Sequence, residues 1–332
     1  MSDNPELTEL TELTELTAQA ELPQASQMSA PEVAALTEGL VALDVAVGAR
    51  GAVGTALDAV RRAGRGPAPR TAADRAARAE LFQVAAWITF DAERQATSQR
   101  LSRRALDLAR GGAEGPTGVE PLVLAVLAMQ EEHLGRPASS LHLASSVLTR
   151  PDLPGLVTAV FRVRAGRALA RMGRGPQALR ELRTAAELLA DGPTAQDPAW
   201  AWWFDRQELD GHHGLARAAL GDLDAAAELL HGAARPEAAG PAYRVLFAAE
   251  LARVLARAGD WRGADSALSA LMDAVPSVGS VRALRVMDHA AGVVVRGHRV
   301  PPRTRDTARE LVRLLRALPG SAYSPAGTPA SG

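Results

Sequence analysis

A repeated interval between small residues and glycines constrains the fold of this chain more than any other feature of its sequence. An alanine or glycine stands seven positions before a glycine at five places: Ala128/Gly135, Gly166/Gly173, Gly214/Gly221, Ala252/Gly259 and Ala290/Gly297. Seven residues make about two helical turns, so both residues lie on one face of a helix. The small residue lets a partner helix approach closely, and the glycine can adopt the left-handed conformation that ends a helix. The interval therefore predicts helical hairpins.

The spacing of the five glycines predicts how these hairpins are arranged. They recur at intervals of 38, 48, 38 and 38 residues, which is typical of α-solenoids. A second small residue follows five positions after four of the glycines and predicts a matching contact in the second helix: Ser140, Ala178, Ala226 and Ala264. Long Ala/Leu/Val segments have helical periodicity, and none alternates like a β-strand. We therefore predict an all-α fold, a right-handed α-solenoid of about seven hairpins.

Glycine- and proline-rich breaks divide the chain into three parts. Residues 1–28 contain a repeated Leu-Thr-Glu triplet, and we expect them to form a disordered tail. We expect residues 29–318 to form the solenoid and residues 319–332 to form a second disordered tail. Within the solenoid we expect helices at 31–47, 50–63, 71–91, 94–110, 119–134, 137–149, 154–172, 175–190, 199–220, 222–234, 241–258, 261–274, 280–297 and 303–318.

Composition excludes several classes of function. The chain has no cysteine, which excludes disulfides, thiol catalysis and thiolate zinc sites. The net charge is −1, so no overall field favours nucleic acid or an anionic membrane. The N-terminal residues lack the pattern of a secretory signal, and no run of 18 uncharged apolar residues is present. We expect a cytoplasmic protein without a membrane span, and the sequence gives no indication of a cofactor or a metal.

The segment richest in functional side chains is WAWWFDRQELDGHHG, residues 200–214. Its aromatic residues predict packing between hairpins, or ligand recognition by Trp202, Trp203, Arg206 and His212 in the solenoid groove. On a helix, Asp205, Glu208 and His212 share one face, so a metal-dependent enzyme that uses Glu208 and His212 is an alternative. Such a site needs a third ligand from a distant helix, with His133, Glu131 and Glu250 as candidates.

A stripe of arginines is the second candidate site. Arg164, Arg167 and Arg171 follow a helical spacing, and Arg180 and Arg183 come on the next helix. If both groups faced the concave surface, they would hold a carboxylate or phosphate through paired hydrogen bonds. However, every basic residue of the chain other than histidine is an arginine, which indicates a coding bias. We therefore expect this stripe to be a solvated helix face rather than an anion site.

No sequence motif of an enzyme is present. The segment GARGAVGT, residues 48–55, has neither the spacing of a dinucleotide fingerprint nor the lysine of a phosphate loop, so it predicts a hairpin turn. The nucleophile elbow and the zinc-binding HExxH motif are also missing. These observations favour a protein that is not an enzyme.

Parts of the chain resemble known helical repeats. The segments PQALRELRTAAELL and DLDAAAELLHGAA resemble second helices of degenerate tetratricopeptide repeats. Residues 82–110, 134–148 and 198–226 resemble the helical-repeat region of actinobacterial transcriptional regulators of the Cro/repressor type. The resemblance implies a cytoplasmic regulatory domain of tetratricopeptide-like hairpins that binds a protein, a peptide or a small molecule and acts in transcriptional or developmental control.

One departure from this family bears on DNA binding. The Leu-Thr-Glu tract stands where the family has its N-terminal helix-turn-helix, so we expect no direct contact with nucleic acid. A regulator that contacts DNA through another element, such as the arginine-rich helix 303–318, is the alternative. Lysine and asparagine, which form the carboxylate clamp of peptide-binding tetratricopeptide repeats, are missing from the predicted solenoid.

Overall fold

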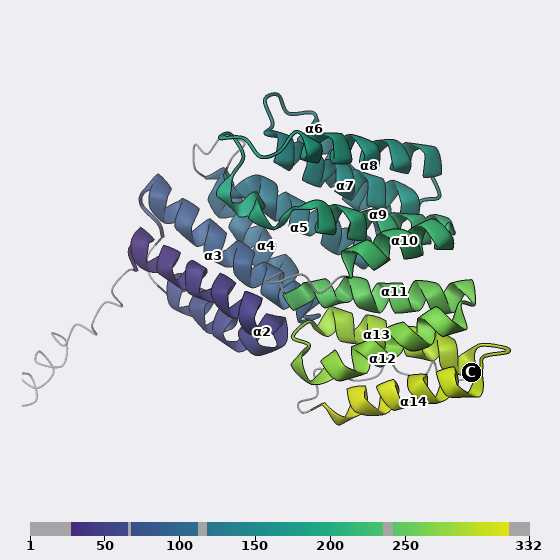
Figure 1. Ribbon diagram of the computed structural model, residues 1–332. Coiled ribbons are helices and arrows are strands. Elements are labelled where there is room, and N and C mark those ends of the chain that lie inside the picture. The colour runs from purple at the N-terminus through teal and green to yellow at the C-terminus, as the bar shows by residue number, and fades with distance from the viewer. Residues whose placement is uncertain (1–27, 66–67, 112–117, 235–241, 319–332) are drawn as a thin grey trace, which may run out of the picture.

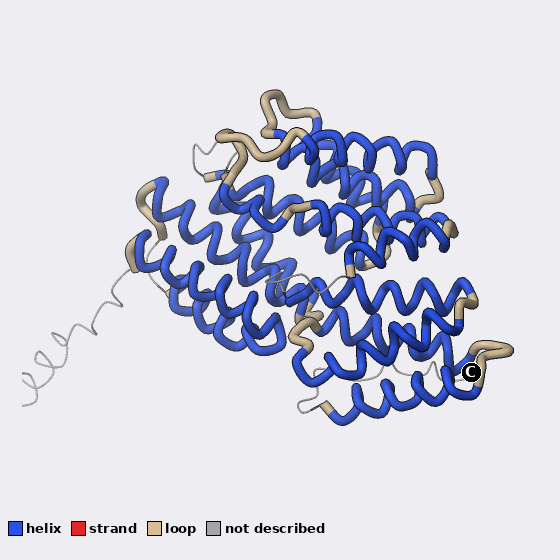
Figure 2. Tube along the Cα trace, viewed as in Figure 1, coloured by secondary structure: helices blue, strands red, loops and turns tan. Residues whose placement is uncertain are grey.

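The computed structural model describes residues 28–65, 68–111, 118–234 and 242–318 (Figure 1). In these ranges the chain is all-α and contains no strand (Figure 2), which confirms the predicted fold class. The α-helices are α2 (Ala30–Gly64), α3 (Ala72–Asp91), α4 (Gln95–Arg110), α5 (Val119–His133), α6 (Pro137–Leu148), α7 (Gly155–Arg171), α8 (Gly175–Ala190), α9 (Arg206–Leu220), α10 (Leu223–Ala233), α11 (Val245–Ala258), α12 (Trp261–Ala274), α13 (Val281–Arg296) and α14 (Pro302–Ala317). Three short 3₁₀ segments are η1 (Ala199–Trp203), η2 (Ala242–Arg244) and η3 (Val275–Ser277). The tails predicted for residues 1–27 and 319–332 lie outside the described residues.

The hairpins form a solenoid and approach each other through the small residues that the sequence predicted. A Cβ atom added to Gly166 of α7 would lie 2.8 Å from Leu182 Cγ and 3.2 Å from the carbonyl oxygen of Ala178, both on α8. Gly214 of α9 has the same relation to α10, with the corresponding distances 2.7 Å and 3.2 Å. The alanines of the interval, Ala128, Ala252 and Ala290, are fully buried. Small side chains therefore set the separation of the paired helices.

The turn glycines behave as predicted at four of five places. Gly135, Gly173, Gly221 and Gly259 have φ values of 76°, 74°, 86° and 77°, in the left-handed region that ends a helix. The prediction is wrong for Gly297, whose φ is −65° and ψ is 146°. The connection from α13 to α14 is longer than the other turns, and its left-handed residue is Arg299, with φ 58°. Gly297 is nevertheless closely packed, because an added Cβ would be 2.7 Å from Val300 Cγ2 in the same connection and 3.3 Å from the Trp261 ring of α12.

Helix α2 is two helices that fold back on each other at Gly48, where φ is 67° and ψ is 178°. The guanidinium group of Arg78 donates hydrogen bonds to the carbonyl oxygens of both Ala63 and Met28, so the two ends of α2 lie close together. This reversal confirms the predicted hairpin of 31–47 and 50–63. By length and hydropathy alone Ala30–Gly64 would qualify as a membrane span, but the reversal divides it into two shorter helices that pack against α3.

Two predicted helices begin later than expected. The prediction of one helix over 199–220 is wrong, because η1 ends in extended backbone at Phe204 and α9 starts at Arg206. The Asp205 side chain accepts a hydrogen bond from the backbone N–H of Glu208 at 2.9 Å and so caps α9. Likewise, the helix expected over 241–258 starts at Val245, after η2.

The beginning and the end of the solenoid touch, which turns the stack of hairpins into a closed ring. The backbone N–H of Arg50 donates to the carbonyl oxygen of Gly279 at 2.8 Å. At the C-terminal end of α3, Asp91 accepts hydrogen bonds from Arg282 Nε at 2.7 Å and from Ser280 Oγ at 2.9 Å. All three side chains are buried. The inner surface of the solenoid is therefore enclosed from both ends of the sequence.

Candidate functional site

Two cavities lie along the inner helices of this ring. The first, with a volume of about 250 Å³, is lined by α2, α3, α5, η1 and η2 and by single residues of α7 and α9; we call it the aromatic chamber. The second has a volume of about 400 Å³ and is lined mainly by α5, α7, α9, α11 and α13; we call it the arginine groove. Met129 of α5 contributes to both cavities.

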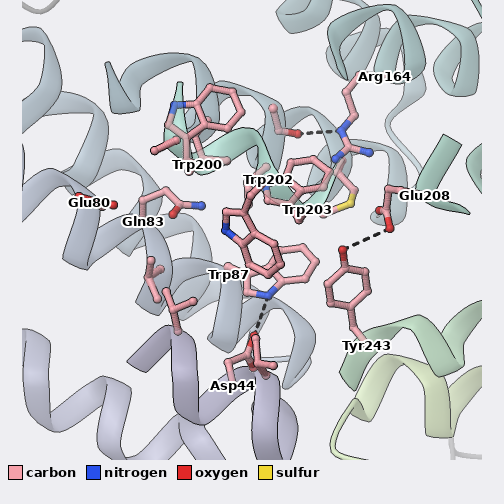
Figure 3. A pocket seen from close by; sticks show the side chains of 18 residues that line it. Asp44, Glu80, Gln83, Trp87, Arg164, Trp200, Trp202, Trp203, Glu208 and Tyr243 are labelled. Atoms are coloured by element: carbon pink, nitrogen blue, oxygen red, sulfur yellow. Dashed lines mark hydrogen bonds between the residues drawn. The ribbon is translucent and has the colours of Figure 1, made fainter. Parts of the chain in front are cut away.

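Five aromatic side chains from three elements surround the aromatic chamber (Figure 3). They are Trp87 of α3, Trp200, Trp202 and Trp203 of η1, and Tyr243 of η2. The rings of Trp87 and Tyr243 meet edge to face, with centroids 5.1 Å apart. Trp202 is 58% exposed although it lines the cavity. An exposed indole at a largely apolar cavity is available to a ligand, because its surface is not yet buried by the protein.

The short 3₁₀ segment explains how three tryptophans reach one cavity. Trp200 Nε1 donates a hydrogen bond to the carbonyl oxygen of Gly118 at 3.3 Å, which fixes η1 to the start of α5. Arg244 Nη2 donates to the carbonyl oxygen of Trp203 at 3.2 Å and fixes the other end. Phe204 is buried directly after η1. These anchors leave Trp202, between them, as the residue that projects into the cavity (Figure 3).

Two polar side chains, Asp44 and Gln83, give the aromatic chamber its electrostatic character. Asp44 accepts a hydrogen bond from Trp87 Nε1 at 3.1 Å. Burial raises the pKa of Asp44 to about 7, with Asp91 adding to the rise and Trp87 and Arg282 opposing it. Gln83 is 4% exposed, and Figure 3 shows its amide directed into the cavity without a hydrogen bond to the other residues drawn. The chamber thus contains an amide that is not bonded to the other lining residues and an acid whose pKa lies near neutral pH.

A buried polar layer separates the two cavities, with His212 of α9 at its centre. His212 Nε2 lies 3.2 Å from Glu208 Oε1, and Arg167 Nη1 lies 3.1 Å from His212 Nδ1. A proton on Nε2 satisfies the contacts with Glu208, which accepts, and with Arg167, which donates to Nδ1, but it sets that N–H against Arg164 Nη1, a second donor 3.1 Å from Nε2. Glu208 also accepts a hydrogen bond from Tyr243 Oη at 3.2 Å. Burial, together with Glu208, raises the pKa of Tyr243 well above its ordinary value, so the phenol remains a donor.

The charge state of this layer follows from its burial. Burial lowers the pKa of His212 to about 4; Glu208 opposes this shift, and Arg164 and Arg167 add to it. The imidazole is therefore neutral at physiological pH. Arg164 is 5% exposed, and burial lowers its pKa to about 10, so it keeps its charge. Its Nε donates to the carbonyl oxygen of Ala125 at 3.2 Å.

The arginine stripe lies only in part on a solvated helix face: Arg171 is exposed, as the sequence led us to expect, whereas Arg164 is buried and Arg167 is half-buried. Arg164 borders the aromatic chamber, whereas Arg167 and Arg171 border the arginine groove. Arg167 is held by Glu132 of α5 through two contacts of 2.9 Å. The reason is the position of α7, which is an inner helix of the ring, so Arg164 and Arg167 meet α5 and α9 rather than water. Arg180 and Arg183, on the outer helix α8, are exposed and line neither cavity.

The other predicted site residues do not share one site: some line the aromatic chamber, one lines the arginine groove and one lies outside both. Trp202 and Trp203 line the aromatic chamber and His212 lines the arginine groove. Arg206 lines neither cavity; its side chain is 76% exposed and pairs with Asp210 at 2.9 Å. The break between η1 and α9 accounts for this, because it removes Arg206 from the helical register that joined it to the tryptophans.

The structure gives no support to the metal site considered for Glu208 and His212. Within the described ranges, no group of three His, Asp or Glu side chains is placed to hold a metal ion. Asp205 pairs with Arg244 at 2.7 Å instead of turning toward His212. The distant candidates are engaged elsewhere: His133 with Glu93, Glu131 with Arg136, and Glu250 with Arg253.

The arginines of α14 are held largely by their neighbours. Arg303 Nε lies 3.2 Å from Asp265 of α12, Arg309 pairs with Asp306 at 3.3 Å, and Arg313 pairs with Glu310. Arg305 donates to the carbonyl oxygen of Gly297 at 3.3 Å. These pairings do not leave a continuous stripe of free cations along the helix.

Sequence reasoning missed Trp87, Tyr243, Asp44 and Gln83, which come from three elements outside the tryptophan-rich segment. One signal was available. Five of the seven tryptophans and tyrosines of the chain line this single cavity. Rare aromatic residues in an alanine-rich chain were therefore a guide to the site, even where they stand alone.

The chain matches no protein-family model and no curated protein. Among solved structures it is similar to PilW, described as a widely conserved type IV pilus biogenesis factor. The two chains are 16% identical, the match covers 74% of this chain and 92% of PilW, and the TM-score is 0.42. Similarity at this level concerns the helical architecture alone.

Proposed function

We propose that this protein is a non-enzymatic binding protein whose aromatic chamber takes up an apolar or aromatic group of a partner. The partner is a protein segment or a peptide, and a small-molecule effector fits the same chemistry. The observation that carries this proposal is the chamber itself: five aromatic rings gather around about 250 Å³, and one of them, Trp202, remains 58% exposed. Aromatic side chains with a few polar groups are the usual lining of ligand pockets.

The polar groups of the chamber favour binding over chemistry. Glu208 and its neighbour His212 are buried and engaged with each other and with Tyr243, Arg164 and Arg167, so neither presents a free acceptor to the aromatic chamber. A general base must instead present a free acceptor to its substrate. The amide of Gln83, which points into the cavity, offers a donor and an acceptor that would orient a bound group.

The proposed biological setting is regulation in the cytoplasm. The resemblance of residues 198–226 to the repeat region of Cro/repressor-type regulators supports a cytoplasmic role in transcriptional or developmental control. In this role the protein acts through partners rather than by direct contact with DNA or a membrane. The pairing of the α14 arginines with nearby carboxylates supports the absence of DNA contact.

Selection from a displayed library of linear peptides, followed by calorimetric titration of the enriched peptides, tests the chamber as the binding site. Trp202→Ala should weaken the enriched peptides by about tenfold or more, because a central aromatic contact contributes roughly 1.4 kcal/mol or more. Arg206→Ala is the matched control, since Arg206 lies on the neighbouring turn outside both cavities. Equal affinity of both variants would contradict the assignment. The assignment would also be contradicted if the selection enriched no peptide and no compound from a library of small apolar molecules raised the melting temperature of the protein.

A further inference from the structure

The arginine groove contains more cations than its carboxylates can hold. Six arginines line it: Arg167, Arg171, Arg253, Arg257, Arg282 and Arg285. The carboxylates in its lining are three: Glu93, Glu132 and Glu250. Positively charged side chains that gather in a recessed surface raise the local electrostatic potential and attract anions.

Each of these carboxylates is already committed to an arginine. Glu132 receives Arg167 at 2.9 Å, Glu250 receives Arg253 at 2.5 Å, and Glu93 receives Arg285 at 2.6 Å. Burial would raise the pKa of Glu132, but Arg167 and Arg171 outweigh it and lower that pKa. The carboxylate is therefore ionised and fully used by its partners.

Arg171 and Arg257 remain without a carboxylate at hydrogen-bond distance among the described residues. The nearest carboxylate oxygen to Arg171 is on Glu132, 3.8 Å from Nε and already bonded to Arg167. Arg257 Nη1 donates only to the carbonyl oxygen of Ala218, at 3.4 Å. These two guanidinium groups come from different inner helices, α7 and α11, and both border the groove.

We infer that the arginine groove is an anion-binding site for a ligand group with two or more negative charges, held by Arg171 and Arg257. A diphosphate and a pair of carboxylates share this chemistry, because the planar guanidinium fork donates two parallel hydrogen bonds to either. The arginine groove and the aromatic chamber are separate cavities. The inference therefore adds a second subsite to the proposed function and does not depend on the first.

Titration of the full-length protein with inorganic pyrophosphate tests the anion site, and a parallel titration with citrate separates phosphate from carboxylate ligands. We expect saturable binding of at least one probe that weakens as salt rises, because the contact is between charges. In the double variant Arg171→Ala/Arg257→Ala the affinity should fall by about tenfold or more, because both guanidinium groups that donate to the anion are lost.

The matched control is Arg180→Ala/Arg183→Ala, which removes the same charge from the exposed face of α8. This control should keep the affinity of the wild type. Trp202→Ala should also keep it, which separates the anion site from the aromatic chamber. Equal losses in both double variants would show a nonspecific charge effect and overturn the inference. Absence of binding of both probes at millimolar concentration, with the protein folded by circular dichroism, would also overturn it.

Discussion

Gly48 and Gly279 lie backbone against backbone at the point where the two ends of the solenoid meet. A Cβ atom on Gly48 would lie 2.6 Å from the Cα of Gly279, and one on Gly279 would lie 2.1 Å from the carbonyl oxygen of Val47. The obstructing atoms are backbone atoms, which cannot move aside as a flexible side chain would. This contact brings α2 and its Asp44 to the rim of the aromatic chamber.

Gly279→Ala should therefore destabilise the protein by about 1–3 kcal/mol, the usual range for overpacking. Urea unfolding followed by circular dichroism measures the change. Gly54→Ala, in the same α2, is the control, because an added Cβ there has no neighbour within 4 Å. A loss no larger in Gly279→Ala than in Gly54→Ala would contradict the contact between the two ends.

Removing the charge of Arg282 alone should lower the free energy of unfolding more than removing the charges of both Arg282 and Asp91. Asp91 is 2% exposed, so Arg282→Met leaves a buried carboxylate with Ser280 as its remaining donor, which costs about 3–5 kcal/mol. In Asp91→Asn/Arg282→Met no buried charge is left, and the loss should be smaller. Calorimetric melting of Arg282→Met, Asp91→Asn and the double variant, together with the wild type, forms a double-mutant cycle. Additive losses would mean that the two groups do not interact.

Close contact at Gly166 predicts a loss of stability on substitution by alanine. The new methyl group would meet Leu182 Cγ at 2.8 Å on the facing helix, so α7 and α8 must separate or Leu182 must leave its rotamer. We expect a loss of about 1–2 kcal/mol. Gly232→Ala in α10 has no neighbour within 4 Å and should be neutral or stabilising, because alanine favours helices. The midpoints of thermal melting compare the two.

The raised pKa of Asp44 predicts a pH dependence of stability. The unfolded chain loses this proton near pH 3.9, whereas the folded protein keeps it up to about pH 7. The stabilising contribution is therefore complete below about pH 4 and is lost as the pH rises through 7. Asp44→Asn keeps an acceptor for Trp87 Nε1 and lacks this titration. The difference in unfolding free energy, wild type minus variant, should fall between pH 4 and pH 8 in urea titrations. A constant difference would show that Asp44 has an ordinary pKa in the fold.

The hairpins of this protein are determined by short-range patterns in its sequence. A small residue seven positions before a turn glycine places two helices in close contact, and both residues lie within one helix and its end. Gly166 with Ala178, and Gly214 with Ala226, met as predicted because such contacts depend on helical periodicity and on side-chain size alone. The reversal at Gly48 was likewise visible as a glycine-rich turn.

The site depended on contacts between residues far apart in the chain. Arg282 reaches Asp91 across 191 positions, and Trp87 meets Tyr243 from another hairpin. No local sequence pattern indicates that the ring closes. The sequence therefore could not show that Arg164 and Arg167 of α7 face inward or that Asp44 becomes buried. The sequence determined which helices form and how closely each pair packs. The tertiary structure alone decided which faces turn inward, because ring closure sets the burial of each polar side chain and so its charge and its partners.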